Sequence, residues 1–222
     1  MAVTLDQLAP LCAASNLDIL GAFHPTADDM VPKGCATLVL LGPLEPGFWP
    51  AFTMSPEWRD TAPDPMDRWS TRVITALAQH SGAQALFPFG PPPYQPFFRW
   101  ALASGQAWQS PVSLLVHARA GLMVSYRGAL AFSHQMELPP TSPPPCQTCR
   151  DQPCLTACPS GALTQAGYDV PRCHSFLETA AGRPQLENGC TVRRACPLAQ
   201  SYGRVEAQSA YHMSMFHNGA AT

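Results

Sequence analysis

The stretch Cys146-Gln-Thr-Cys149-Arg-Asp-Gln-Pro-Cys154-Leu-Thr-Ala-Cys158-Pro159 places four cysteines at gaps of two, four and three residues. The iron–sulfur motif of bacterial two-cluster proteins has gaps of two, two and three residues before a proline, and its fourth cysteine ligates the other cluster. The middle gap here is longer, which a loop can absorb. Because closely spaced cysteines in a tight loop direct their thiolates to neighbouring corners of an iron–sulfur cube, the stretch predicts a small cluster-binding module.

A second Cys-Pro pair, Cys196-Pro197, follows about fifty residues after the first cysteine of this stretch. In two-cluster proteins the cysteine that precedes the proline crosses to the other cluster. We therefore expect Cys146, Cys149, Cys154 and Cys196 to be the four ligands of one [4Fe–4S] cluster.

Three cysteines remain for a second cluster, namely Cys158, Cys173 and Cys190. A complete second site needs one more cysteine, and Arg193 or a neighbour stands where it is expected. The second site is therefore a three-iron cluster, a four-iron cluster with a non-cysteine ligand, or empty. His174 is the candidate non-cysteine ligand nearest in sequence.

Zinc is the alternative metal, because four thiolates also satisfy a structural zinc site. Paired Cys-x-x-Cys knuckles are the usual zinc signature, and only Cys146 and Cys149 form such a pair. The two Cys-Pro ends favour iron–sulfur ligation. The isolated Cys12 and Cys35 are expected to be small buried hydrophobic residues.

The composition describes a foldable chain, with 222 residues, 46% hydrophobic and 13% charged. The net charge of −2 and the absence of a basic run argue against a nucleic-acid partner. No apolar stretch reaches the length of a membrane span, and the N-terminus does not resemble a secretory signal. We expect a cytoplasmic protein, in which thiols stay reduced and nine cysteines indicate metal ligation rather than disulfides.

A proline-rich segment, 138–145, separates the cysteine-poor and cysteine-rich parts of the chain and predicts a stiff spacer. We therefore expect an α/β domain at 1–138 and a small iron–sulfur domain with a C-terminal helix at 139–222. Hydrophobic periodicity and turn residues predict the elements of the first domain. Helices are expected at 5–17, 64–81 and 96–104, and strands at 18–23, 37–42, 112–116 and 122–126, the last two as a hairpin.

The cysteine-rich part resembles the iron–sulfur domain of epoxyqueuosine reductases and of the related corrinoid-dependent reductive dehalogenases. The resemblance continues upstream through Arg99–Trp108, Ser113–Gly121 and Tyr126–Leu130, which are similar to the helix, Gly-x-x-Trp and hairpin of the cobalamin-binding domain. It covers about 63–197. It implies an α+β protein in which a nitroreductase-like, cobalamin-binding-type α/β domain precedes a ferredoxin-like domain, with a cofactor held between them.

The same resemblance implies site residues outside the cysteines. Trp108, His117 and Tyr126 correspond to the cofactor-binding segment, and Asp67 falls where the family has a proton-donating aspartate. Two of these have simpler interpretations. Asp67 is also placed to interact with a helix N-terminus, and a histidine beside a turn is commonly a hydrogen-bonded surface residue.

Together these observations predict an iron–sulfur redox protein. The first hypothesis is a reductase that passes electrons from [4Fe–4S] clusters to cobalamin or flavin in the N-terminal domain, and so acts on a small-molecule substrate. The second is a ferredoxin-like carrier without catalytic activity, and the third is a zinc-stabilised structural protein. Both redox hypotheses need an electron-transfer partner, such as a flavodoxin or ferredoxin reductase that donates electrons.

Overall fold

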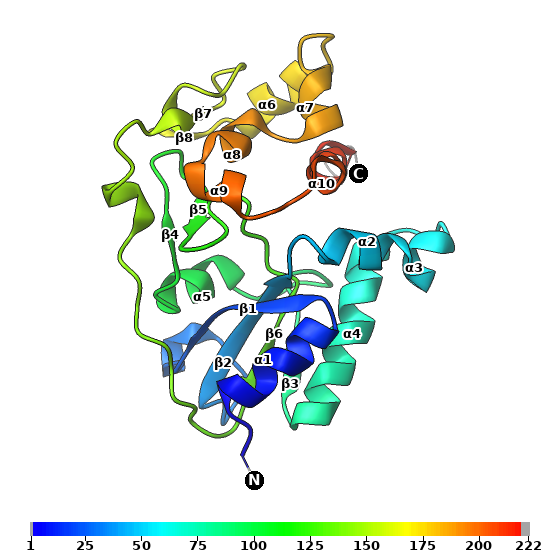
Figure 1. Cartoon of the computed structure of the whole chain (residues 1–222), viewed down its shortest axis with the longest axis vertical. Helices are drawn as coiled ribbons and strands as arrows, with labels where there is room; N and C mark the ends of the chain where they lie inside the picture. Colours follow the sequence, from blue (N-terminus) through cyan, green and yellow to red (C-terminus); the bar gives the residue numbers. More distant parts are fainter. Residues whose placement is uncertain (1, 219–222) are drawn as a thin grey trace. The chain divides into compact units, whose positions relative to one another are not determined.

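The computed structural model describes residues 2–218 and divides into two compact units (Figure 1). The first unit comprises the chain up to Ala107 together with Ser125–Ser142. The second comprises Trp108–Val124 together with the chain from Pro143 onward. A single cut at the proline-rich segment does not describe this division, because the residues of 108–124 belong to the second unit although they precede that segment. The fold class is mixed α+β.

The first unit is built on a four-stranded antiparallel sheet with the order β1-β2-β6-β3. Every residue of the two central strands, β2 and β6, is buried. A strand covered on both faces is a continuous apolar run without alternation, which is the pattern that predicted β2. The strands are β1 (Leu17–Phe23), β2 (Thr37–Pro43), β3 (Gln84–Leu86) and β6 (Gly128–Phe132).

Two helices pack on this sheet and against each other. α1 (Leu5–Ala14) contacts β1, and α4 (Pro65–Ser81) contacts β3 and β6 (Figure 1). α4 confirms the predicted helix, since it buries Trp69, Ile74 and Leu77 at helical spacing. The remaining helical elements are η1 (Ala27–Asp29), α2 (Phe48–Thr53), α3 (Pro56–Arg59) and α5 (Phe97–Ala103).

The predicted hairpin is only partly correct. β5 (Leu115–His117) exists, but it pairs with β4 (Ala107–Gln109) and not with 122–126. The stretch 122–126 is not a strand: its apolar residues are buried as irregular chain, and the regular strand begins at Gly128. A backbone bridge between His117 and Gly121 closes the turn after β5.

The cysteine-rich part of the second unit consists of short elements, because prolines and glycines repeatedly interrupt it. Cys154 itself lies in a 3₁₀ turn of three residues. The elements are η2 (Pro145–Gln147), η3 (Pro153–Leu155), β7 (Leu163–Thr164), β8 (Gly167–Tyr168), α6 (Val170–Leu177), α7 (Arg183–Asn188), α8 (Thr191–Ala195), α9 (Pro197–Ser201) and α10 (Glu206–Asn218). α10 packs against α7.

All nine cysteines are free thiols. Cys12 is fully buried in α1, which confirms its interpretation as a core residue. Cys35 is only half-buried, and its thiol donates a hydrogen bond to the carbonyl oxygen of Thr37 at 3.4 Å. Across residues 2–218, no helix has the length and apolar character needed to cross a bilayer.

Candidate metal centre

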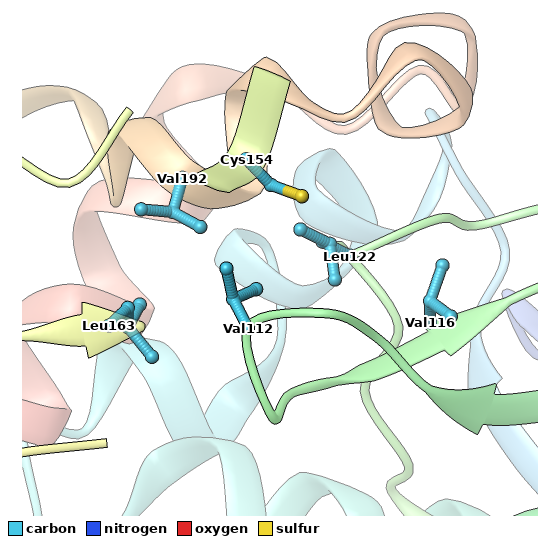
Figure 2. Close-up of a cluster of buried hydrophobic side chains, with 6 residues drawn as sticks. All are labelled: Val112, Val116, Leu122, Cys154, Leu163 and Val192. Carbon is cyan, nitrogen blue, oxygen red and sulfur yellow. The ribbon is translucent and has the colours of Figure 1, made fainter. Parts of the chain in front are cut away.

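The core of the second unit joins the loop before the proline-rich segment to the cysteine-rich part. Figure 2 shows this core, in which Val112 and Leu122 lie with Val192 and Cys154. In the view the Cys154 sulfur points toward Leu122. The thiol therefore emerges from an apolar cluster, where water has little access.

Four thiols surround one cavity of about 420 Å³ in the second unit. The side chains of Cys146, Cys149, Cys154 and Cys196 all line it. Apolar residues complete its wall beside the thiols, among them Val116, Leu122 and Leu198. The cavity thus brings three thiols of the first cysteine motif together with one from the second Cys-Pro pair.

Proline positions these thiols. Cys146 and Cys154 each follow a proline that begins a 3₁₀ turn, η2 and η3, and the fixed φ of proline favours such a start. Cys196 is the residue between α8 and α9, and Pro197 is the first residue of α9. The backbone there is extended, so the two helices are separate and the thiol lies at their junction.

The four thiols interact electrostatically with one another. Burial raises the pKa of the Cys146 thiol to about 11, and the charges of Cys154, Cys196 and Cys149 add to that rise. Burial, followed by the charges of Cys196 and Cys149, also raises the pKa of the Cys154 thiol. Since burial and neighbouring like charges oppose ionisation of Cys146 and Cys154, a bound positive group would favour the thiolate form of both. Within the described range 2–218, no group of three or more His, Cys, Asp or Glu side chains is arranged to hold a metal ion.

Two residues of the loop 108–124 complete the cavity and could not be identified from the cysteine spacing. The Ser110 side chain lines it and is only 6% exposed, and the Ser110 hydroxyl makes no hydrogen bond to the described part of the chain. Gly121 has a φ of +54°, and a Cβ at this position would lie 2.8 Å from the Cys196 sulfur and 2.6 Å from the backbone nitrogen of Ala199. Only glycine leaves this space open.

A second group of thiols comprises Cys158, Cys173 and Cys190. The charges of Cys190 and Cys158 both raise the pKa of the Cys173 thiol, although burial is the largest cause. Cys158 lies ahead of β7, Cys173 lies in α6, and Cys190 precedes α8. Tyr168 lies beside this group, since it packs with Cys158 against the buried cluster that contains Cys173.

The surroundings of the Cys158 thiol favour its ionisation. The backbone N–H of Leu163 donates to its sulfur at 3.5 Å, and the Ser160 hydroxyl lies 3.4 Å from it. Burial raises the pKa of the Cys158 thiol, but the hydrogen bonds from Ser160 and from backbone groups outweigh burial and lower it overall. The turn after Cys158 thus favours the thiolate, the form that binds metal.

His174, the candidate non-cysteine ligand, lies against α10. Its ring stacks on Phe216 with centroids 4.5 Å apart and planes at 15°. Its Nδ1 lies 3.1 Å from the Nδ1 of His217, close enough for a hydrogen bond. These contacts hold the imidazole on the side of α6 that faces the C-terminal helix.

The proposed proton donor, Asp67, lies in the first unit in the first turn of α4. Its Oδ1 accepts a hydrogen bond from Nη1 of Arg127 at 3.3 Å, and the Arg127 guanidinium also lies over the Phe89 ring at 5.9 Å. Burial raises the pKa of the Asp67 carboxyl more than the Arg127 charge lowers it. A cavity of about 390 Å³ adjoins Asp67 and Phe89.

The three residues predicted to bind a cofactor fall in two units. Trp108 and His117 belong to the second unit and Tyr126 to the first. His117 is 1% exposed, so it is not a surface residue. Its Nδ1 accepts hydrogen bonds from the backbone N–H groups of Arg119 and Ala120 at 3.1 and 3.2 Å. This histidine closes the turn after β5.

No family model matches the chain, and neither does any curated protein or solved structure.

Proposed function

We propose that this chain is an iron–sulfur redox protein with a [4Fe–4S] cluster in the four-thiol cavity. The observation that carries the proposal is the convergence of Cys196 with Cys146, Cys149 and Cys154 on one apolar cavity. Soft thiolates are the ligands that iron–sulfur clusters require, and four of them complete such a cluster. The ferredoxin-like spacing of the first motif favours iron–sulfur over zinc.

The residues around the cavity fit a buried anionic cluster. Val116, Leu122 and Leu198 exclude water beside the thiols, and Gly121 leaves room next to the Cys196 sulfur. The unpartnered Ser110 hydroxyl can donate a hydrogen bond into the cavity. A bound cluster supplies one-electron transfer, and the chain's part is to hold it, to shield it and to set its potential.

The more specific proposal is a reductase in which the first unit is a nitroreductase-like domain that binds cobalamin or flavin. Its support is the resemblance of 63–197 to epoxyqueuosine reductases and the surroundings of Asp67. A carboxyl whose pKa is raised by burial retains a proton more readily and suits a proton donor, and Arg127 fixes its orientation. A small-molecule substrate and an electron donor such as a flavodoxin or ferredoxin reductase follow from this proposal, as does a cytoplasmic location, where thiols stay reduced.

A ferredoxin-like carrier is the second candidate function. It shares the cluster and differs only in lacking a cofactor in the first unit. The cavity beside Asp67, about 390 Å³, lies at the small end of ligand pockets, so it favours this candidate over a reductase that holds a corrin there but does not separate it from a flavin reductase.

Purification without oxygen tests these proposals. We expect a brown protein that contains iron and acid-labile sulfide and is bleached by chemical reduction. A colourless protein whose thiols hold zinc would contradict both redox functions. Titration of the purified protein with cobalamin and with flavin then separates the candidates. Tight binding with a spectral shift supports the reductase, and no binding of either supports the carrier.

A further inference from the structure

The four-thiol cavity has a buried side and a solvent-facing side. Leu122 and Cys154 line it from the buried apolar core of the second unit, where Figure 2 shows them together. Thr148, Arg150 and Asp151 also line the cavity, but these three residues are exposed. Residues that line a cavity and are themselves exposed lie at its mouth. We call these three residues the rim of the cavity.

The rim lies at the longer middle gap of the first cysteine motif. This gap, 150–153, is two residues longer than in the bacterial iron–sulfur motif, and each of its four residues lines the cavity. The added length brings a cation and an anion, Arg150 and Asp151, to the cavity mouth. The longer gap therefore builds the solvent-facing side of the cavity.

Cys149 is the cavity thiol on the side of the rim, because its chain neighbours are Thr148 and Arg150. Cys154 belongs to the apolar core of the second unit, and Cys146 and Cys196 pack against that core. Among the residues that the structure describes, Cys149 is the one cavity thiol outside this core. An electron carrier therefore approaches the four thiols most closely over Cys149.

The charges of the rim are available to a docking protein. Arg150 and Asp151 are exposed, and neither forms a hydrogen bond or an ion pair with another residue of the described range 2–218. A partner can pair with both charges without breaking an existing ion pair. Charged groups at the edge of an interface orient the partner and raise the rate of encounter.

We infer that the loop 148–152 is the electron-entry site of this protein, where a one-electron carrier protein docks over Cys149. Such a carrier presents an acidic side chain to Arg150 and a basic one to Asp151. One electron passes from the carrier, which is oxidised, to the cluster, which is reduced, and no covalent bond forms or breaks. The inference rests on the proposed iron–sulfur function and specifies the surface that its electron donor contacts.

Stopped-flow reduction of the full-length iron-containing protein tests this site with two small reductants of opposite charge. At low salt, Arg150→Glu should slow reduction by anionic dithionite at least about twofold and speed reduction by the methyl viologen radical cation, and Asp151→Arg should do the reverse. At about 1 M salt, where the Debye length is about 3 Å, these differences should disappear.

Arg183→Glu is the matched control, because it makes the same change in net charge. Arg183 is the exposed first residue of α7 and does not line the cavity. It should leave both rates unchanged at low salt. Rates in Arg150→Glu and Asp151→Arg that equal those of wild type, or an effect of Arg183→Glu as large as that of Arg150→Glu, would overturn the electron-entry site.

Alkylation of the full-length chain after removal of iron by a chelator gives a test that needs no bound cluster. Iodoacetamide should modify Cys149 before Cys154, because reactivity follows the exposure of the thiol, and the same chain in denaturant provides the reference rates. Equal rates for the two thiols, or faster modification of Cys154, would contradict the position of Cys149 at the rim. A purified chain that contains no iron overturns the proposed function, whereas the order of alkylation still tests the rim.

Discussion

Gly121 lies directly against Cys196: a Cβ placed on this glycine would be 2.8 Å from the cysteine sulfur. The loop 108–124 and the second Cys-Pro pair are far apart in sequence, so this contact ties the four-thiol cavity to a segment that holds no cysteine. Arg193 makes a parallel link through its hydrogen bond to the carbonyl of Leu122. The cavity is thus built jointly by the cysteine motifs and by the turn after β5.

Gly121→Ala should lower the iron content of the purified protein, because the added methyl group pushes on the Cys196 sulfur and on the backbone of α9. Gly82→Ala is the matched control. Gly82 also has a left-handed φ, +70°, but nothing lies within 4 Å of its Cβ position. Both changes should destabilise the fold by about 1 kcal/mol from the backbone alone. Equal iron content in the two variants would show that Gly121 makes no room for a ligand sulfur.

Cys146→Ser and Cys196→Ser should remove the same signal from the spectrum of the reduced protein, since both thiols line one cavity. Cys12→Ser is the control, because Cys12 is buried in α1 of the first unit and should leave every cluster signal unchanged. Electron paramagnetic resonance of the reduced variants makes the comparison. If the two serine variants lose different signals, the crossed ligation is wrong.

Ser110→Ala should shift the midpoint potential of the four-iron cluster to a more negative value without loss of iron. The buried hydroxyl has no partner within residues 2–218, and a bond from it to a cluster sulfur would stabilise the reduced state. Ser113→Ala, on the same loop but outside the cavity lining, should leave the potential unchanged. A redox titration followed by absorbance measures both. Identical shifts in the two variants would point to a general effect of the loop.

Glu57→Gln should destabilise the first unit at neutral pH by about 1 kcal/mol, because Glu57 Oε1 and Oε2 accept hydrogen bonds from Arg72 Nε and Nη2 at 2.5 and 3.0 Å. This hydrogen bonding lowers the pKa of the Glu57 carboxyl, although burial opposes the change. The pair therefore stabilises the fold above the ordinary glutamate pKa of about 4.3, and its contribution is lost as pH falls through the lowered value.

Denaturant unfolding at several pH values should show the gap between wild type and Glu57→Gln closing in acid. The exposed Glu137 provides the control, since Glu137→Gln should produce no gap at neutral pH. A gap for Glu57→Gln that stays constant from neutral pH into acid would mean that the effect comes from packing and not from the ion pair.

The local pattern of apolar residues was sufficient to predict two kinds of element: a long helix with one apolar face, and a strand that is buried on both faces. The periodicity around Trp69 and Ile74 predicted α4, and the apolar run at 37–42 predicted β2. The stretch 122–126 was wrongly predicted to be a strand. Its residues are apolar because they are buried, and they do not pair with a neighbouring strand. β6 was missed because three of its five residues, Gly128, Ala129 and Ala131, are small and have low strand propensity, although the strand is buried on both faces as β2 is.

Some residues of the candidate site could likewise be predicted from local sequence, and others could not. Cysteine spacing is a local signal, and it predicted which four thiols line one cavity. Ser110 and Gly121 could not be predicted, because each matters only through a contact with a residue distant in sequence or through a cavity that distant segments form. The same long-range contacts place 108–124 in the second unit, which the position of the proline-rich segment could not indicate.

The most direct test of the central claim is the metal content of wild type and of the Cys146→Ser/Cys196→Ser double variant, both purified without oxygen. A [4Fe–4S] cluster in the four-thiol cavity predicts that the double variant contains about four fewer irons and four fewer acid-labile sulfides per chain than wild type, with no zinc in either. Equal iron in the two proteins, or about one zinc per chain that the double variant loses, would contradict it.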